Sequence, residues 1–308
     1  MTSFDVVGLG FSSLDTVGLV PQLPQLDEGA PLLGITRQGG GPVAQALVTL
    51  QRLGAATGYV GSLGDDEAGQ AMVAGLRAEG VDTSRLIITP GRTSPQCIIL
   101  VHAPTGLRSI CCEGGTAPPV PSEGLDLDYL CSGLFLHLDG IAGEAALVTA
   151  KEAKRRDVRV CLDAGGPSDA LFALVPHVDV LIASERFVAG TAGSPGIADG
   201  AAQLLTQGPS IVVVTSGKQG SWTASTSGAF ATPAFDVPVV DTTGAGDVFH
   251  GAFLYGLVQG WDLPVVTRFA AATAALKCRK LGGRAGIPSL PDVLAFLAEQ
   301  GETSPGGC

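Results

Sequence analysis

The chain has 308 residues, of which 45% are hydrophobic and 15% charged, enough for one large domain or two ordinary ones with a sizeable core. Lys and Arg total 18 against 29 Asp and Glu, and the net charge of -11 argues against binding to nucleic acid, which requires basic contacts to phosphate. No apolar run approaches the roughly 20 residues of a membrane span, and the N-terminus has no basic flank, so we expect a cytoplasmic protein without a signal peptide.

Short β-branched runs alternate with helical stretches along the whole chain. A strand is predicted at residues 5–10, and apolar residues recur at a helical period over residues 43–53. Further buried strands are expected at 133–137, 158–163, 178–183 and 211–215, and further helices at 68–79, 263–281 and 292–299. This alternation predicts one α/β domain over residues 1–308. Its mostly parallel sheet would be covered by helices on both faces, with ligands at the carboxyl ends of the strands.

Two segments do not fit this alternation. Residues 14–38 are rich in Pro and Leu without a helical period, and residues 96–112 predict a hairpin that turns at Pro104-Thr105-Gly106. Extended segments that project from an α/β core predict a small lid sheet. The tail at 303–308 is expected to be disordered.

The cysteines favour a reduced protein. There are seven, an odd number, and none forms a C-x-x-C pair. Cys111 and Cys112 are adjacent, which is awkward in a disulfide scaffold. We therefore expect scattered reduced thiols in the core and no metal site built from them.

The most informative segment is residues 241–247, with the sequence DTTGAGD. The preceding residues 236–240 are strand-like, and the apolar residues 248–260 predict a buried helix. A glycine turn between a strand and a helix forms an anion site, because the first amides of a helix have no carbonyl partner. Gly244 and Gly246 would let this backbone, with Ala245 between them, approach a phosphate closely.

Asp247 would lie beside the bound anion. A carboxylate in this place can accept the proton of a hydroxyl that attacks a phosphoryl group. Two simpler interpretations compete: the acid may only complement the helix dipole, and Gly-Ala-Gly may be an ordinary tight turn. Taken alone, the glycines favour the simpler interpretation.

The combination of motifs resembles the ribokinase/PfkB family of sugar kinases. The glycine-rich residues 39–42 (GGGP), residues 60–69 (VGSLGDDEAG) and residues 212–220 (VVVTSGKQG) occur in the family's order with the DTTGAGD string. Within the family the chain looks most similar to bacterial sulfofructose kinases and ketohexokinase-like members. The resemblance implies a ribokinase-like fold with a β lid that often makes dimer contacts. It also implies transfer of the γ-phosphate of ATP, with Mg²⁺, to a hydroxymethyl group of a ketose or pentose-like sugar.

The resemblance also implies roles for single residues. Asp247 would be the base, and the amides of Gly244, Ala245 and Gly246 would receive the phosphoryl charge. The sugar would contact Asp15, Asp27, Gly39, Gly40 and Gly41, while Arg108 is either an anionic-sugar ligand or a solvated hairpin residue. ATP would contact Thr215, Ser216, Gly217, Gly220 and Thr243. Glu185 would face Mg²⁺ through water, and Asp241 with the Thr243 carbonyl would hold a monovalent cation such as K⁺.

The chain departs from the family at three positions. Ala44 stands where the family commonly has Asn, and Ser184 and Phe187 replace the ends of an Asn-x-x-Glu motif. These changes leave the identity of the sugar undetermined. They also leave two alternative functions: a nucleoside kinase of the same fold, or a non-catalytic sugar-binding regulator. The sulfonate-binding Arg of sulfofructose kinase has its counterpart near Gly140, which does not support that substrate.

Two nucleotide-binding motifs are incomplete. Gly8-Leu9-Gly10 lacks the third glycine of a dinucleotide fingerprint, because position 13 is Ser. Gly217-Lys218 is followed by Gln219, so no Walker-type loop is present. Both a dehydrogenase and a Walker-type ATPase are therefore disfavoured.

Overall fold

The structure is a computed structural model that describes residues 4–191 and 196–302, so the tail at 303–308 lies outside the described residues. A central sheet has the order β14-β13-β12-β11-β10-β9-β1-β4. Its strands are β1 (Phe4–Leu9), β4 (Thr57–Val60), β9 (Gly133–Leu138), β10 (Arg159–Ala164), β11 (Val180–Ser184), β12 (Ile211–Thr215), β13 (Ser221–Ser225) and β14 (Gly228–Thr232). All pairs from β12 to β4 are parallel, whereas β13 and β14 form an antiparallel edge. The expected α/β fold is confirmed.

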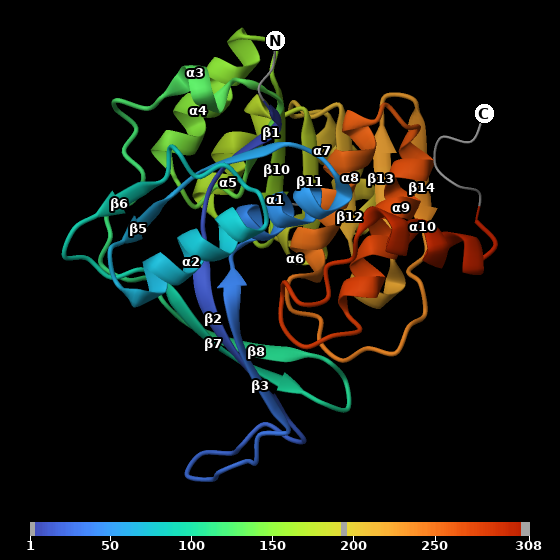
Figure 1. Ribbon diagram of the computed structural model, residues 1–308. Coiled ribbons are helices and arrows are strands. Elements are labelled where there is room, and N and C mark those ends of the chain that lie inside the picture. The colour runs from blue at the N-terminus through green and yellow to red at the C-terminus, as the bar shows by residue number, and fades with distance from the viewer. Residues whose placement is uncertain (1–3, 192–195, 303–308) are drawn as a thin grey trace.

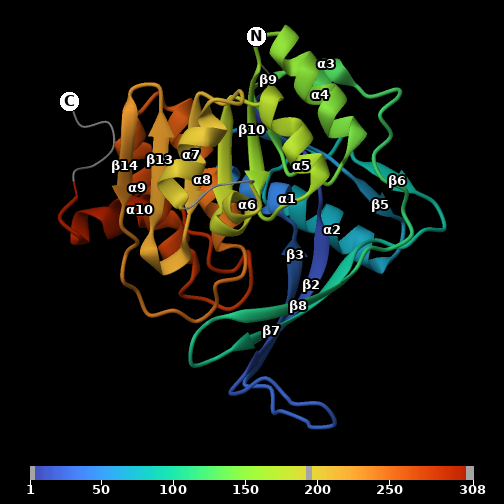
Figure 2. The ribbon, with the colours of Figure 1, turned by 180° about the vertical axis from the view of Figure 1, so that it is seen from behind.

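Helices cover both faces of this sheet, as Figures 1 and 2 show from opposite sides. One layer contains α1 (Pro42–Leu53), α2 (Glu67–Ala78), α8 (Ala245–Val258), α9 (Leu263–Lys277) and α10 (Leu290–Glu299). The other contains α3 (Leu127–Leu130), α4 (Glu144–Arg155), α5 (Asp169–Leu174), α6 (Glu185–Ala189) and α7 (Ile197–Leu205). Each layer has its own hydrophobic cluster against the sheet, which explains the near-continuous apolar runs of the central strands. Within the described ranges, no helix has both the length and the apolar character needed to cross a membrane.

A second sheet projects from one end of the α/β core (Figure 1). Its order is β3-β2-β7-β8, from β2 (Ser13–Val20), β3 (Gly34–Gly40), β7 (Gln96–His102) and β8 (Arg108–Glu113). The hairpin predicted at 96–112 is β7–β8, and residues 14–38 supply β2 and most of β3. We call these four strands the lid sheet. Two short strands, β5 (Ser62–Gly64) and β6 (Ile87–Thr89), pair separately.

The strand predicted at residues 236–240 is wrong. The segment belongs to none of the three sheets and forms neither a strand nor a helix. The amides of Val240 and Asp241 donate to the carbonyl oxygen of Cys278 at 2.8 and 3.1 Å. Cys278 is the C-cap of α9, which ends at Lys277 rather than at residue 281. The apolar run therefore binds the end of a helix, and long-range pairing of this kind has no local sequence signal.

The expectation that all cysteines are reduced is also wrong, because Cys97 and Cys112 form a disulfide. The antiparallel register of β7 and β8 places the two residues directly opposite each other, with their Cα atoms 4.1 Å apart. Cys111 points to the other face of the hairpin and is an exposed free thiol. Three further free thiols are Cys131, Cys161 and Cys278.

Candidate active site

The N-terminus of α8 lies at the turn that the sequence singled out. Gly244 is its N-cap and has a φ of +74°, a left-handed conformation that favours glycine. The amides of Gly244 and Gly246 have no hydrogen-bond partner within the part of the chain that the structure describes. The amide of Ala245 instead donates to the Thr242 carbonyl at 3.2 Å. Two of the three expected amides are therefore available to an anion, and the third is engaged in its own turn.

Asp247 follows in the first turn of α8 and is partly exposed. Burial raises the pKa of its carboxyl, and the neighbouring His250, Arg108 and Lys277 oppose this effect. The His250 ring is buried, with Nδ1 2.7 Å from the Gly246 carbonyl oxygen and Nε2 3.2 Å from the Ile182 carbonyl oxygen. His250 thus packs between α8 and the sheet.

Four carboxyl groups from different elements converge at this place. Burial raises the pKa of Asp15 to about 6 and that of Asp139 to about 7, and the charge of Asp247 adds to both shifts. Burial likewise raises the pKa of Asp163 to about 6, with a further increase from Asp247. Asp139 follows β9 and Asp163 is the penultimate residue of β10, so the carboxyl ends of neighbouring strands meet here. Sequence reasoning missed both, although an acid directly after an apolar strand is a visible signal.

The glycine run at the end of β3 makes room for Asp15. The Ser13 hydroxyl donates to Asp15 Oδ1 at 2.6 Å, and a β-carbon at Gly40 would collide with the Asp15 carboxylate. Gly41 caps α1 with a φ of +96°, where a β-carbon would collide with the Phe11 carbonyl oxygen. Gly39 packs instead on the guanidinium of the buried Arg284. Of the three glycines, Gly40 is thus the one that directly makes room for Asp15.

The turn of the lid hairpin is hydrogen-bonded to the 241–247 loop. The Gly106 carbonyl accepts from the Thr242 amide at 3.0 Å and from the Thr242 hydroxyl at 2.9 Å. Arg108 Nη1 donates to the same hydroxyl at 3.3 Å. Arg108 is therefore a lid residue that reaches the loop beside Asp247.

The predicted nucleotide residues form the turn between β12 and β13. The Ser216 amide donates to the Gly220 carbonyl at 2.8 Å, and both Gly217 and Gly220 have positive φ, at 54° and 94°. Thr215 closes β12 with a 3.3 Å bond from its hydroxyl to the Ala183 carbonyl. The hydroxyls of Ser216 and Thr243 are buried without a partner among the described residues. Buried hydroxyls are normally bonded, so these two are suited to contact a polar ligand.

The altered Asn-x-x-Glu motif has become structural. The Ser184 hydroxyl caps α6 by accepting from the Phe187 amide at 3.2 Å and donates to the Gly165 carbonyl at 2.9 Å. Phe187 is fully buried. Glu185 is exposed at the first position of α6. It directly follows β11, the strand that pairs with the Asp163 strand β10. Within the described ranges, no three His, Cys, Asp or Glu side chains group closely enough to hold a metal by themselves.

Asp241, the expected ligand of a monovalent cation, is fully buried. Its Oδ1 accepts from the Thr243 amide at 2.8 Å and its Oδ2 from the Gly282 amide at 2.6 Å. Its carbonyl oxygen accepts from Lys277 Nζ at 2.9 Å. The expected cation ligand therefore already has three protein donors.

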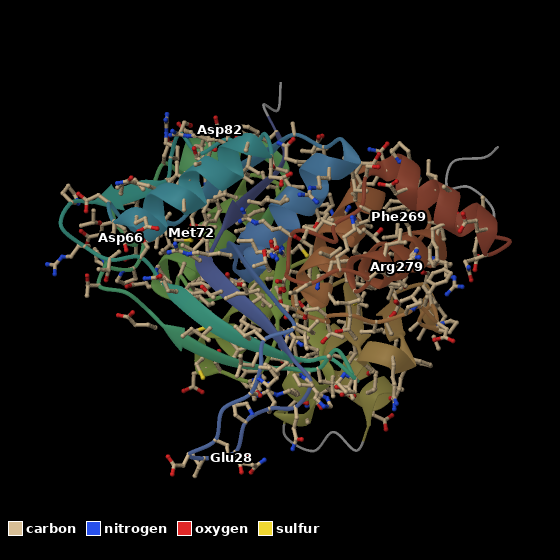
Figure 3. All side chains as sticks on the ribbon, turned by 60° about the horizontal axis from the view of Figure 1, so that its bottom comes forward. Glu28, Asp66, Met72, Asp82, Phe269 and Arg279 are labelled. Carbon is tan, nitrogen blue, oxygen red and sulfur yellow. A yellow bond between two sulfur atoms is a disulfide. The ribbon has the colours of Figure 1, made fainter. Side chains whose placement is uncertain are left out.

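One sequence-predicted site residue, Asp27, lies away from the carboxyl cluster. Asp27 is exposed in the loop between β2 and β3, next to Glu28 at the far tip of the lid sheet (Figure 3). The fold of this chain does not bring Asp27 to the site. Ala44 is fully buried in the first turn of α1.

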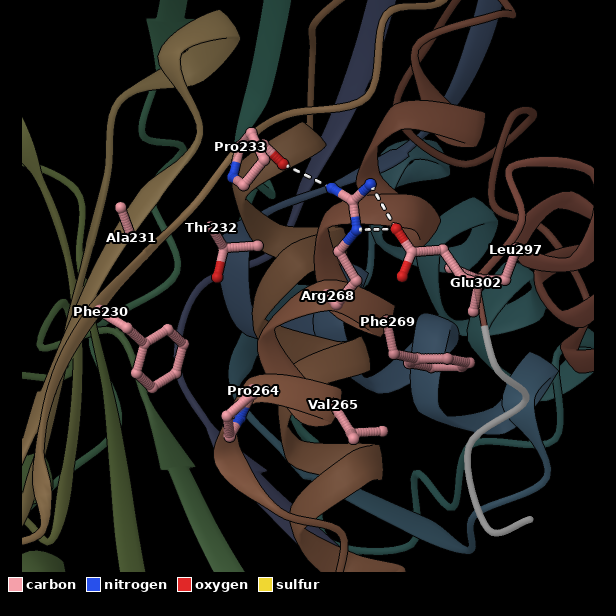
Figure 4. Close-up of a pocket in the computed structure, with 10 residues that line it drawn as sticks. All are labelled: Phe230, Ala231, Thr232, Pro233, Pro264, Val265, Arg268, Phe269, Leu297 and Glu302. Atoms are coloured by element: carbon pink, nitrogen blue, oxygen red, sulfur yellow. Dashed lines mark hydrogen bonds and ion pairs between the residues drawn. The ribbon is translucent and has the colours of Figure 1, made fainter.

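A cavity of about 300 Å³ lies elsewhere, between β14 and α9 (Figure 4). Arg268 bridges it, with Nε 2.7 Å from Glu302 Oε1 and Nη1 2.8 Å from the Pro233 carbonyl oxygen. No predicted site residue lines this cavity. Its cation is already paired, so the carboxyl cluster under the lid sheet is the better candidate site.

Comparisons with known proteins agree with this architecture. The sequence model of the pfkB family carbohydrate kinases matches residues 6–290. A 5-dehydro-2-deoxygluconokinase from Shouchella clausii is 27% identical and covers 96% of this chain and 96% of its own length. An ATP-dependent ribose-1-phosphate kinase from Halopiger xanaduensis is 28% identical over 96% of this chain and 98% of its own. The structure of Arabidopsis thaliana ribokinase complexed with ribose and ATP superposes with a TM-score of 0.82 at 25% identity, covering 96% of this chain and 98% of that one.

Proposed function

Because this chain belongs to the pfkB family of carbohydrate kinases, we propose that it transfers the γ-phosphate of ATP to a hydroxymethyl group of a ketose or pentose-like sugar. The observation that carries the proposal is the first turn of α8, where Asp247 lies next to the free amides of Gly244 and Gly246. A proton acceptor beside donors for developing negative charge is the arrangement that phosphoryl transfer to an alcohol needs.

Each side of the site would hold one substrate. Asp15, a desolvated residue of the lid-sheet strand β2, would accept hydrogen bonds from sugar hydroxyls. The nucleotide would contact the turn at residues 215–220 and the unpartnered hydroxyls of Ser216 and Thr243. Asp247 would take the proton of the attacking hydroxyl while the two glycine amides receive the phosphoryl charge. Arg108 would neutralise negative charge on either substrate from the lid sheet.

Mg²⁺ would be held mainly by the phosphates of ATP and by water. Magnesium prefers oxygen ligands and keeps several waters, so a site without a full protein cage fits it. Asp163 and Glu185, on neighbouring strand ends, are the carboxylates that would face it. When bound, the ion would neutralise charge on the phosphates.

Asp247→Asn tests the assignment. The amide side chain keeps the shape of the site but cannot take a proton, so kcat should fall by about 10²–10⁴. Calorimetry should still detect binding of sugar and ATP. Turnover should be screened by ADP release with fructose, ribose, 5-dehydro-2-deoxygluconate, ribose 1-phosphate and nucleosides. Near-normal turnover of the variant would exclude Asp247 as the base.

Two alternatives are separated by the same screen. A nucleoside kinase would respond to nucleosides alone, but residues 14–38 contain no aromatic side chain to stack on a base. A sugar-binding regulator would bind ligands without releasing ADP, which the intact Asp247 argues against.

We also infer a homodimer through the outer face of the lid sheet. Ile35 and Ile98 lie on that face with exposed fractions of 64% and 62%. Large apolar side chains that gather on one exposed face favour association. Analytical ultracentrifugation measures this state directly.

A further inference from the structure

Lys277, the last residue of α9, has a fully buried side chain. Buried lysines are rare unless the ammonium is paired, because removing a charge from water is unfavourable. The Nζ atom donates to the Asp241 carbonyl at 2.9 Å, so the ammonium lies directly beneath the start of the DTTGAGD loop. A buried charge in this place calls for a role that a neutral side chain would not fill.

Two carboxylates near Lys277 partly offset the effect of its burial. Burial lowers the pKa of the ammonium and the charge of Arg108 adds to this effect, whereas the negative charges of Asp241 and Asp247 oppose it. Asp241 is itself fully buried, and its backbone carbonyl oxygen accepts the hydrogen bond from the ammonium. The two side chains thus balance each other's charge at the base of the loop.

A monovalent metal ion does not fit the same place. Such an ion binds by replacing its water shell with carboxylate and carbonyl oxygens. Here each carboxylate oxygen of Asp241 already uses one of its two lone pairs to accept from the Thr243 or the Gly282 amide. Its carbonyl oxygen already accepts from Lys277, and a second cation beside that ammonium would be repelled.

We propose that the Lys277 ammonium serves as a built-in cation that holds the 241–244 loop in shape, so that the protein works without K⁺. Through Asp241 the ammonium is connected to Thr243, whose amide bonds the carboxylate, and Thr243 directly precedes Gly244. Lys277 is therefore a positioning residue for the free amides of Gly244 and Gly246. The expected effect of Lys277 on turnover rests on the proposed phosphoryl transfer, whereas its expected effect on the stability of the loop does not.

The test compares Lys277→Ala with Lys280→Ala, a matched control three residues later whose side chain is exposed. Initial rates of ADP release are measured in choline chloride and in KCl at equal ionic strength. We expect the wild type and Lys280→Ala to have equal rates in both salts within about twofold. Lys277→Ala should lose at least about tenfold in choline, as for loss of a preorganised charge, and regain rate with K⁺ or methylammonium.

Three results would overturn the proposal. One is activation of the wild type by K⁺ beyond the expected limit of about twofold, since the ion would then supply a charge that the protein lacks. The second is a Lys277→Ala rate equal to that of the wild type in choline. The third is a folded Lys277→Ala that neither cation restores, since its defect would then not be one of charge. The wild-type measurement decides the matter even if Lys277→Ala does not fold.

Thermal melting of the unliganded protein gives a readout that is independent of turnover. The wild type should melt at the same temperature in choline and K⁺, whereas Lys277→Ala should melt lower and recover in K⁺ or methylammonium. If no sugar is phosphorylated, the proposed function fails, but the melting data still decide the role of Lys277. A wild type stabilised by K⁺ over choline would contradict the built-in cation.

Discussion

Replacement of Asp15 by Asn should stabilise the protein while weakening its binding of sugar. Asp15 is only 6% exposed, and burial raises its pKa from 3.8 to about 6. An Asn can keep the 2.6 Å bond from Ser13, since its Oδ1 accepts in the same place. The substitution therefore removes a buried charge with little other change.

The magnitude follows from the pKa shift. A shift of about 2 units corresponds to about 3 kcal/mol, at 1.36 kcal/mol for each unit. Because the folded-state pKa of Asp15 lies above its unfolded value, the proton binds the folded protein more tightly. The contribution of this group to stability is therefore lost as pH rises from about 4 to about 6. Asp15→Asn should be more stable by about 1–3 kcal/mol at pH 7.5, and the gain should shrink to about 1 kcal/mol or less at pH 4.5.

Thermal melting at the two pH values measures this gain, and steady-state kinetics at pH 7.5 measures the accompanying rise in sugar KM. Asp27→Asn is the control, because Asp27 is exposed in the lid loop. A less stable Asp15→Asn at pH 7.5, or a gain that does not depend on pH, would refute the reasoning.

Two further predictions concern the lid sheet. Gly40→Ala should push the Asp15 carboxylate aside and raise the sugar KM about 10–100-fold, as for a lost charge-assisted hydrogen bond. The control is Gly29→Ala, which should leave KM unchanged because a β-carbon at Gly29 has open space. Equal KM values for both variants would contradict the predicted collision. Cys112→Ser should lower stability by about 3 kcal/mol, because the disulfide closes a loop with a sequence separation of 15. Melting curves of Cys112→Ser and of the exposed control Cys111→Ser would decide this, and identical curves would count against it.

Local sequence patterns were sufficient to predict a helix or strand wherever the residues that define it are close in sequence. The helical period at 43–53 and the turn residues at 104–106 each predict one element, and the structure contains α1 and the β7–β8 hairpin there. Parallel order could be predicted from alternation alone, because a helix between two strands brings the second strand back in the same direction.

The remaining features depend on contacts between distant segments. The Cys97–Cys112 bond depends on the exact register of two strands, which a hairpin prediction leaves open by one residue. Residues 236–240 look like a strand because they are rich in valine, yet the backbone at Val240 bonds to the end of α9. The sequence marks Asp139 as an acid at a strand end, but its proximity to Asp247, like the burial of Lys277, depends on how β9 and α9 are placed beside the 241–247 loop.

One contact has a consequence for the order of events during turnover. Gly106, at the turn of the β7–β8 hairpin, accepts two hydrogen bonds from Thr242. A hairpin that swings outward to admit a sugar must give up both bonds, and the residues just before Gly244 then lose an anchor. In the proposed reaction, binding of the sugar and ordering of the backbone at Gly244 would thus be coupled. An open hairpin would hold that backbone less firmly, which would disfavour hydrolysis of the nucleotide before a sugar is bound.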